Sequence, residues 1–126
     1  MKKLLTAILV MATLTAGALS KISEVARIET ETISLGKMVQ NVPATATFII
    51  TNTSKQPIII EKASPTCGCT VADFTKTPIA PGKTGIVKAT YNAATLGSVN
   101  KTIFLKLNGV EEVKELHITG EVVAKS

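Results

Sequence analysis

Aromatic residues are scarce in this sequence of 126 residues, which has no tryptophan, one tyrosine and three phenylalanines. Proteins that bind single-stranded nucleic acids stack bases on aromatic side chains, and basic patches on one face attract the phosphates. Here the lysines are spread along the chain between acidic residues, although the formal net charge is +5. The positive charge is better explained by solvation, so we expect no nucleic-acid partner.

A recognisable catalytic set is also lacking. His117 is the only histidine, and alternation along its predicted strand places it on an outward face. Ser64 and Ser98 have no recognisable histidine or lysine relay, and Asp73 has no carboxylate partner placed for acid–base chemistry. No glycine-rich phosphate-binding loop is present. We therefore expect a protein that is not an enzyme, with no catalytic residues and no cofactor.

Only one long apolar run is present, and it lies at the start of the chain. Residues 1–3 are positively charged at two positions, residues 4–14 are apolar apart from two threonines, and residues 16–20 supply small side chains. This order is typical of a cleavable signal peptide. The apolar run is also shorter than the roughly 20 residues of a membrane span. A retained anchor or a buried helix is the alternative.

We therefore expect residues 1–20 to be a helical signal peptide and residues 21–126 to form the exported domain. Neither cysteine lies near the cleavage site, so no lipid acceptor is expected there. The prediction is a periplasmic or extracellular protein with no stable membrane anchor after cleavage.

From Ala26 onward, apolar and polar residues alternate with a period of two, which indicates β-strands. The clearest strands are expected at 45–52, 57–62, 85–91, 102–107 and 115–123, with less regular ones around 27–35 and just after Cys69. Residues 58–60 are three isoleucines, apolar on both faces, which favours a central strand.

Turn residues separate these strands. Pro81 and Gly82 predict a type II turn, because proline presets the first central residue and glycine accepts the positive φ of the second. Asn108-Gly109 predicts a turn between the last two strands. About seven short strands in roughly 100 residues are typical of a β-sandwich. We therefore expect one all-β, immunoglobulin-like domain of about seven antiparallel strands.

A series of motifs then follows in a fixed order. They are Leu35-Gly36, Phe48 to Asn52, Pro57 to Ile60, Cys67-Gly68-Cys69-Thr70, Ile79-Ala80-Pro81-Gly82, Gly97, Lys101-Thr102-Ile103 and Leu116 to Val122. In this order the chain resembles the bacterial domain of unknown function 1573 family, which is grouped with Hydin-type and major-sperm-protein-like immunoglobulin folds. It departs from the family pattern at Ser34, at Ser54 and at 64–66. The resemblance implies the fold and export, but no established activity.

The tripeptide Cys67-Gly68-Cys69 is the one chemical anomaly. On an extended strand the two Cα atoms would be about 6.6 Å apart, at roughly 3.3 Å per residue. A disulfide needs the Cβ atoms at about 3.8 Å, so closing the bridge requires a kink. Gly68 is the residue type that permits a kink at little cost, and Pro65 also suggests a turn.

Three interpretations of this motif stay open. The cysteines are packed as small apolar residues, either as thiols or in a static bridge. Alternatively, Cys67 and Cys69 form an exchangeable disulfide in an oxidising compartment. In the third interpretation, their thiolates bind Cu(I), with only His117 and Met38 as further soft ligands.

The function we expect is that of an exported, non-enzymatic binding or structural module with an unknown protein or glycan partner. The first surface to test is the loop from Cys67 to Thr70, with the turn at Pro81 and Gly82 expected beside it. The alternative is a thiol-redox or Cu(I)-binding protein that acts through the two cysteines.

Overall fold

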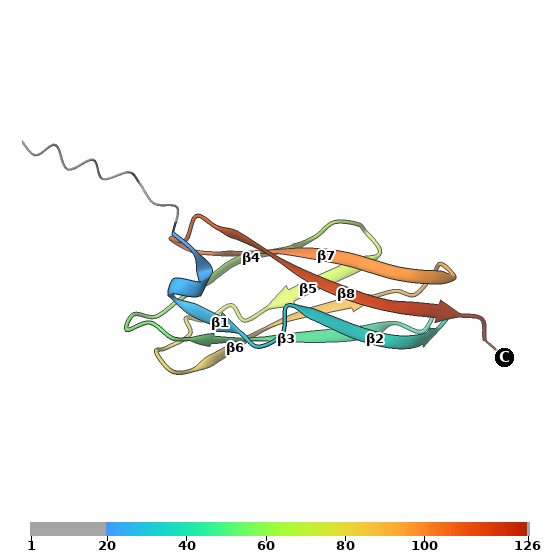
Figure 1. Ribbon diagram of the computed structural model, residues 1–126, viewed down its shortest axis with the longest axis horizontal. Coiled ribbons are helices and arrows are strands. Elements are labelled where there is room, and N and C mark those ends of the chain that lie inside the picture. The colour runs from blue at the N-terminus through green and yellow to red at the C-terminus, as the bar shows by residue number, and fades with distance from the viewer. Residues whose placement is uncertain (1–19, 126) are drawn as a thin grey trace, which may run out of the picture.

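The computed structural model describes residues 20–125, which form a β-sandwich. A short 3₁₀ helix, η1 (Ile22–Glu24), precedes eight strands: β1 (Ala26–Ile28), β2 (Thr32–Val39), β3 (Ala44–Asn52), β4 (Ile60–Pro65), β5 (Thr70–Phe74), β6 (Thr84–Tyr91), β7 (Gly97–Leu107) and β8 (Val113–Val123). Two four-stranded sheets, ordered β1-β3-β6-β5 and β2-β8-β7-β4, face each other (Figure 1). The predicted all-β, immunoglobulin-like fold is confirmed. The predicted signal peptide lies outside the described residues, except for Ser20.

Alternating residues of the long strands build the core between the sheets. Ala46, Phe48 and Ile50 of β3 are buried, and they face the buried residues of the other sheet. The strands expected at 45–52, 85–91, 102–107 and 115–123 are confirmed, as is the short strand after Cys69. Their period-two pattern was informative because one face of each strand packs on the core and the other meets solvent.

The segment expected to be one strand at 27–35 is two strands in different sheets. β1 pairs with β3, whereas β2 pairs with β8 in parallel. Ile28 packs on the core from an even position, while Ile33 and Leu35 do so from odd positions. The positions that face the core therefore change from even to odd numbers where the chain crosses from one sheet to the other. The sandwich therefore has eight strands, and one of its strand pairs is parallel.

The three isoleucines at 58–60 do not form a central strand, as their sequence suggested. β4 begins at Ile60 and is the edge strand beside β7. Ile58 forms an isolated bridge with Ile79, and Ile59 between them is 37 % exposed. Of the three isoleucines, Ile58 and Ile60 are buried and Ile59 is not. The segment was expected to be buried on both faces because Ile59 is apolar although it is exposed.

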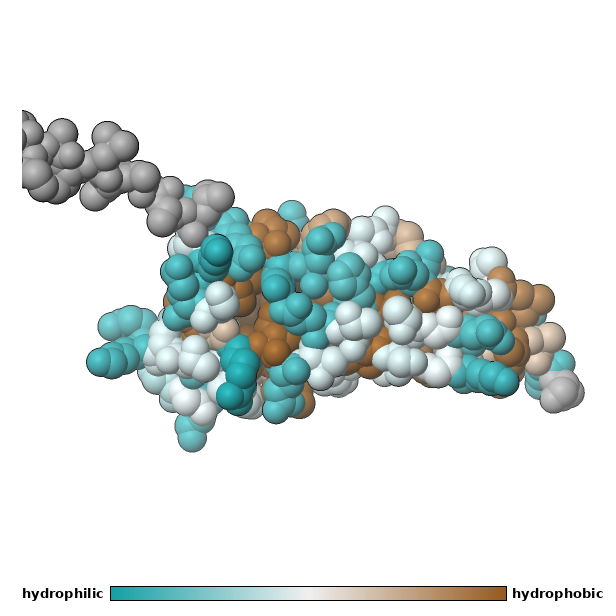
Figure 2. Space-filling view, in the orientation of Figure 1, coloured by the Kyte–Doolittle hydropathy of each residue, from teal (hydrophilic) through white to brown (hydrophobic). Residues whose placement is uncertain are grey.

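From β2 onward, successive connections alternate between the two ends of the sandwich. One end carries residues 53–59, 75–83 and 108–112, and we call it the asparagine end after Asn52. The other carries residues 40–43, 66–69 and 92–96, and we call it the cystine end after the bridge described below. In Figure 2 the tip at the asparagine end, on the left, is mostly hydrophilic, whereas the tip on the right carries apolar surface.

Candidate functional site

Cys67 to Thr70 and the turn at Pro81 and Gly82 lie at opposite ends of the molecule. Thr70 pairs with Tyr91 at one end of β6, whereas Pro81 and Gly82 lead into the other end of this strand. The seven residue steps of β6 span about 23 Å. The expectation that the turn lies beside the cysteines is wrong, because one strand separates the two connections. The predicted turn itself is confirmed: Gly82 has a φ of 77°, and the Lys83 N–H donates to the Ala80 carbonyl at 2.9 Å.

Cys67 and Cys69 are joined by a disulfide, with their Cα atoms 5.3 Å apart. The backbone is kinked here: the Thr70 N–H donates to the Cys67 carbonyl at 3.3 Å, and the Asn92 N–H donates to the Cys69 carbonyl at 3.0 Å. A Cβ atom on Gly68 would meet nothing within 4 Å, and its φ lies outside the left-handed region. The sequence suggested that the kink needs the conformational freedom of glycine. The backbone at Gly68 does not use the positive φ that glycine permits.

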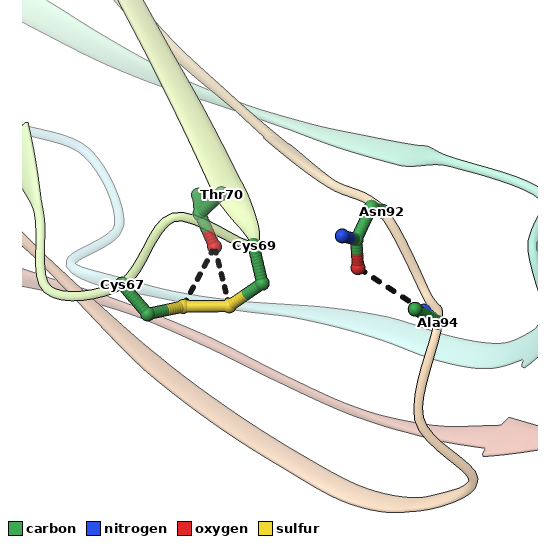
Figure 3. The surroundings of a disulfide bond; sticks show 5 residues. All are labelled: Cys67, Cys69, Thr70, Asn92 and Ala94. Carbon is green, nitrogen blue, oxygen red and sulfur yellow. Dashed lines mark hydrogen bonds between the residues drawn. A yellow bond between two sulfur atoms is a disulfide. The ribbon is translucent and has the colours of Figure 1, made fainter.

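The Thr70 hydroxyl points at the disulfide (Figure 3). Its Oγ1 lies 4.0 Å from Sγ of Cys67 and 3.9 Å from Sγ of Cys69, and the residue is 3 % exposed. A disulfide sulfur carries no proton, so the hydroxyl is the donor in both contacts. Thr70 is thus a buried side chain whose polar atom is directed at the sulfur pair.

The two cysteines are half-buried, and their surroundings differ. Cys69 packs against an apolar cluster at this end of the sandwich, separate from the main core. Its buried members are Met38, Tyr91, Ala93, Val99 and Val122. Lys101 lies on the same face of β7 as Val99 and Ile103, and its Nζ is 5.9 Å from the centre of the Tyr91 ring. The surroundings of the disulfide therefore include an apolar cluster and the positive charge of Lys101.

The bridge stabilises the fold only weakly in the chain-entropy account. Its cysteines are two positions apart, so it closes a very short loop. A loop this short corresponds to about 1–2 kcal/mol, against about 3 kcal/mol for a loop of 15 residues. The turn also has the backbone hydrogen bonds given above. A purely structural role therefore explains little about why two cysteines stand here.

The proposed further copper ligands are only partly brought together. Met38 lies in the apolar cluster that Cys69 contacts. His117 lies on the outer side of its sheet, where its Nδ1 is 3.2 Å from Oγ1 of Thr102. Within residues 20–125 there is no group of three or more histidine, cysteine, aspartate or glutamate side chains placed to hold a metal ion. The described part of the chain also contains no helix with the length and apolarity of a membrane span.

Exposed aliphatic side chains gather at the cystine end, a feature that the sequence reasoning missed. Val39, Val42 and Leu96 are 40 %, 55 % and 52 % exposed. Val39 and Leu96 flank the end of β8 on either side, because Val39 pairs with Val123 and Gly97 pairs with Val122. Two strand spacings separate such positions by about 10 Å. The available signal was the apolar character of Val42 and Leu96, which lie in connections, where residues are usually polar.

Hydrogen bonds hold the two loops that carry these side chains together. The Asn41 N–H donates to the Ala93 carbonyl at 2.8 Å, and the Gln40 side chain donates to the Ala94 carbonyl at 3.1 Å. Asn92 accepts from the Ala94 N–H at 3.1 Å within its own loop (Figure 3). The apolar side chains are therefore presented on an ordered backbone.

The opposite end is organised by Asn52, whose motif position was recognised but whose role was not. It is 1 % exposed, and its Nδ2 donates to the carbonyls of Gln56 and Ile79, both at 2.8 Å. Its Oδ1 accepts from the Ser54 N–H at 2.8 Å and from the Ser54 hydroxyl at 2.7 Å. One buried amide thus ties three chain segments together.

Two surface residues, Lys114 and Asp73, have shifted pKa values, and both lie away from the cystine end. A hydrogen bond of 2.7 Å to Glu31 raises the pKa of Lys114 above its ordinary value. The backbone N–H of Phe74, followed by Lys76, lowers the pKa of Asp73. Both are surface ion pairs, and neither contacts the disulfide.

Comparison with known proteins agrees with this architecture. The family model described as "Protein of unknown function (DUF1573)" matches residues 26–122, so the chain belongs to this family. No curated protein matches the sequence significantly.

Solved structures share the fold at low sequence identity. A protein of unknown function from Porphyromonas gingivalis W83 is similar with a TM-score of 0.65 and 15 % identity, over 77 % of this chain and 46 % of that protein. The PapD-like domain 7 of human CEP192 gives 0.67 and 9 %, over 92 % and 97 % of the two chains. The Pseudomonas aeruginosa CupB2 chaperone gives 0.58 and 10 %, over 76 % and 55 %. This chain therefore spans less than half of the Porphyromonas protein, and these similarities establish the fold alone.

Proposed function

We propose that this member of the DUF1573 family is an exported, non-enzymatic binding module that recognises a partner protein through the cystine end of its sandwich. The observation that carries the proposal is the group of exposed aliphatic side chains at that end: Val39 at the end of β2, and Val42 and Leu96 on two loops that hydrogen bonds hold together. Exposed apolar patches are characteristic of protein interaction sites, and loops on a rigid scaffold commonly carry binding.

A protein partner fits this surface better than a glycan. Sugar rings usually pack their apolar faces on exposed aromatic rings, and the exposed apolar groups here are aliphatic. Tyr91 lies at this end but is 4 % exposed. A glycan partner is therefore an alternative outcome of the experiment below.

Export is supported by the order of charged, apolar and small residues at 1–20 and by the disulfide. Disulfides persist mainly in oxidising compartments such as the periplasm and the cell exterior. The similarity to PapD-like domains supports a fold that is used by binding proteins, and the partner is argued from the surface itself.

The test is to capture proteins from an envelope and secreted fraction on the immobilised chain, under oxidising and reducing conditions. The variant pair Val42→Asp with Leu96→Asp places charge on the apolar end. Val113→Asp is the matched control, because Val113 is 49 % exposed and lies toward the asparagine end on β8. We expect a protein retained by the wild type and by the control to be lost by the double variant.

Recovery of no ligand under either condition contradicts the proposal. Equal capture by the double variant and the wild type also contradicts it, because the apolar end would not contribute. A ligand that is lost on deglycosylation of the extract identifies a glycan and overturns the choice of a protein partner.

A further inference from the structure

The Thr70 hydroxyl is a buried donor whose acceptors are weak. Its side chain is almost completely buried, and within residues 20–125 the hydrogen-bond partners of its hydroxyl are the two sulfurs of the disulfide. At 3.9 and 4.0 Å these are long contacts for a buried donor. A thiolate accepts a hydrogen bond much more strongly than a neutral disulfide sulfur, since hydrogen bonds to charged groups are stronger. The hydroxyl therefore stabilises a cysteine thiolate of the opened bridge more than it stabilises the disulfide.

We infer that Cys67, Cys69 and Thr70 form a thiol–disulfide exchange site, in which the Thr70 hydroxyl stabilises the departing thiolate. The inference stands apart from the proposed binding role, because it concerns the sulfur pair and not the aliphatic surface. Its co-reactant is a dithiol, either a small molecule or an exported protein with two neighbouring cysteines.

The surroundings of the two sulfurs assign their order of reaction. Cys69 packs against the apolar cluster around Tyr91 and precedes the buried Thr70, whereas Cys67 is outside that cluster and lies between the exposed residues Thr66 and Gly68. An incoming thiolate therefore attacks Sγ of Cys67. A bond forms between the incoming sulfur and Sγ of Cys67. The Cys67–Cys69 bond breaks, and its electron pair leaves on Sγ of Cys69.

The second step completes the exchange. The other thiolate of the dithiol attacks its own sulfur in the mixed disulfide, and Cys67 departs as a thiolate. The dithiol becomes a disulfide, the cysteine pair gains two electrons, and the two protons of the dithiol end on Cys67 and Cys69. The reverse reaction restores the bridge.

The turn is built to remain in place during this reaction. Its backbone hydrogen bonds join Thr70 to Cys67, Asn92 to Cys69, and Thr66 to Thr102, the last at 3.1 Å. None of these bonds uses a sulfur atom. Reduction therefore leaves two thiols close together, ready to form the bridge again.

The experiment measures the rate at which dithiothreitol reduces the bridge in the purified chain, with alkylation and mass spectrometry to count thiols. Thr70→Val keeps the shape of the side chain and removes the hydroxyl, whereas Thr70→Ser keeps the hydroxyl. We expect the rate to fall about tenfold in Thr70→Val, the size expected from one hydrogen bond to a charged group, and to stay within about threefold in Thr70→Ser. Circular dichroism and the thermal midpoint verify that each variant is folded.

A bridge that is reduced only when the chain unfolds contradicts the exchange site. Equal rates for folded Thr70→Val and wild type contradict the role of the hydroxyl. Brief treatment with glutathione, followed by acid quenching and peptide mapping, tests the order of attack on the wild type itself. We expect the adduct on Cys67, and an adduct mainly on Cys69 overturns the assignment.

Discussion

The two ends of the sandwich are built by different kinds of interaction. At the asparagine end, the buried amide of Asn52 makes four side-chain hydrogen bonds that join the segments around Gln56 and Ile79 to β3. At the cystine end, the loops are joined mainly by backbone hydrogen bonds, and they leave aliphatic side chains and a half-buried disulfide near the surface. The hydrogen bonds of Asn52 at the first end hold the fold together, whereas the exposed side chains of Val39, Val42 and Leu96 at the second end add nothing to its buried core.

This difference suggests a division of roles. An interaction that ties distant segments together and leaves no polar atom exposed contributes to stability. Apolar groups that remain exposed in a folded chain contribute little to its stability and are available to a partner. We therefore assign stability to the asparagine end and recognition to the cystine end, and substitutions at each end test that assignment.

The largest effect is expected for Asn52→Ala. The change removes four hydrogen bonds, each worth about 0.5–1.5 kcal/mol, and the Ser54 N–H loses its acceptor. The Gln56 carbonyl keeps the Ser54 hydroxyl, and the Ile79 carbonyl keeps the Ile58 N–H. We expect the free energy of unfolding to fall by about 3–4 kcal/mol in chemical denaturation. Ser54→Ala removes a hydroxyl that contacts Oδ1 of Asn52 and, at an exposed position, the backbone of Gln56, and it should cost about 1 kcal/mol. Similar losses for the two variants would show that Asn52 is not the organising residue.

A pair of glycines compares the ends directly. Gly82 at the asparagine end has a φ of 77°, whereas Gly68 at the cystine end lies outside the left-handed region and has open space around its Cβ position. Gly82→Ala should cost about 1–2 kcal/mol of unfolding free energy, because an L-residue is strained at this φ. Gly68→Ala should change stability by less than about 0.5 kcal/mol. A larger loss for Gly68→Ala than for Gly82→Ala would reverse the comparison.

Removing the bridge should cost less than removing the buried amide. The double variant Cys67→Ser with Cys69→Ser loses a very short closed loop, which corresponds to about 1–2 kcal/mol. Urea denaturation of the variant and of the oxidised wild type measures the difference. Loss of cooperative unfolding in the variant would make the disulfide a structural requirement and would remove the contrast between the ends.

The smallest effect concerns the surface pair of Lys114 and Glu31. The pKa of Lys114 is raised in the folded chain, so the pair contributes its full stabilisation below the ordinary value of 10.5 and loses it as pH rises through the folded value. Lys114→Met should therefore lower stability at pH 7 by less than about 1 kcal/mol, with a smaller difference at strongly alkaline pH. Thermal melts of both proteins across this range provide the measurement. A difference that grows toward alkaline pH contradicts this linkage.

Much of the fold could be predicted from the sequence, because strands packed on one side show a clear alternation. The alternation in 45–52 and 102–107 reports which side chains face the core, and these strands lie where expected. The split at 27–35 was missed because three residues, Glu29 to Glu31, separate two strands of opposite phase. The edge position of β4 was missed because Ile59, an exposed isoleucine just before this strand, made the segment 57–62 look apolar on both faces.

The candidate site could be predicted only in part. The spacing of Cys67 and Cys69 shows that a bridge requires a kinked backbone, and the structure has this kink. The Thr70 hydroxyl contact depends on side-chain direction, which spacing does not specify. The separation of Pro81 and Gly82 from the cysteines depends on which end each connection occupies, and this follows from strand order in space. Asn52 stands at the end of a strand, where an ordinary turn residue gives the same sequence signal.

Site-specific photo-crosslinking is a direct test of whether the cystine end recognises a partner protein. A photoreactive amino acid replaces Val42 at the cystine end or Val113 toward the asparagine end, two valines of similar exposure. The chain is then illuminated in the cellular compartment that it occupies. We expect a crosslinked partner protein from position 42 and none from position 113. Crosslinks from position 113 alone, or none from position 42, would contradict recognition at the cystine end.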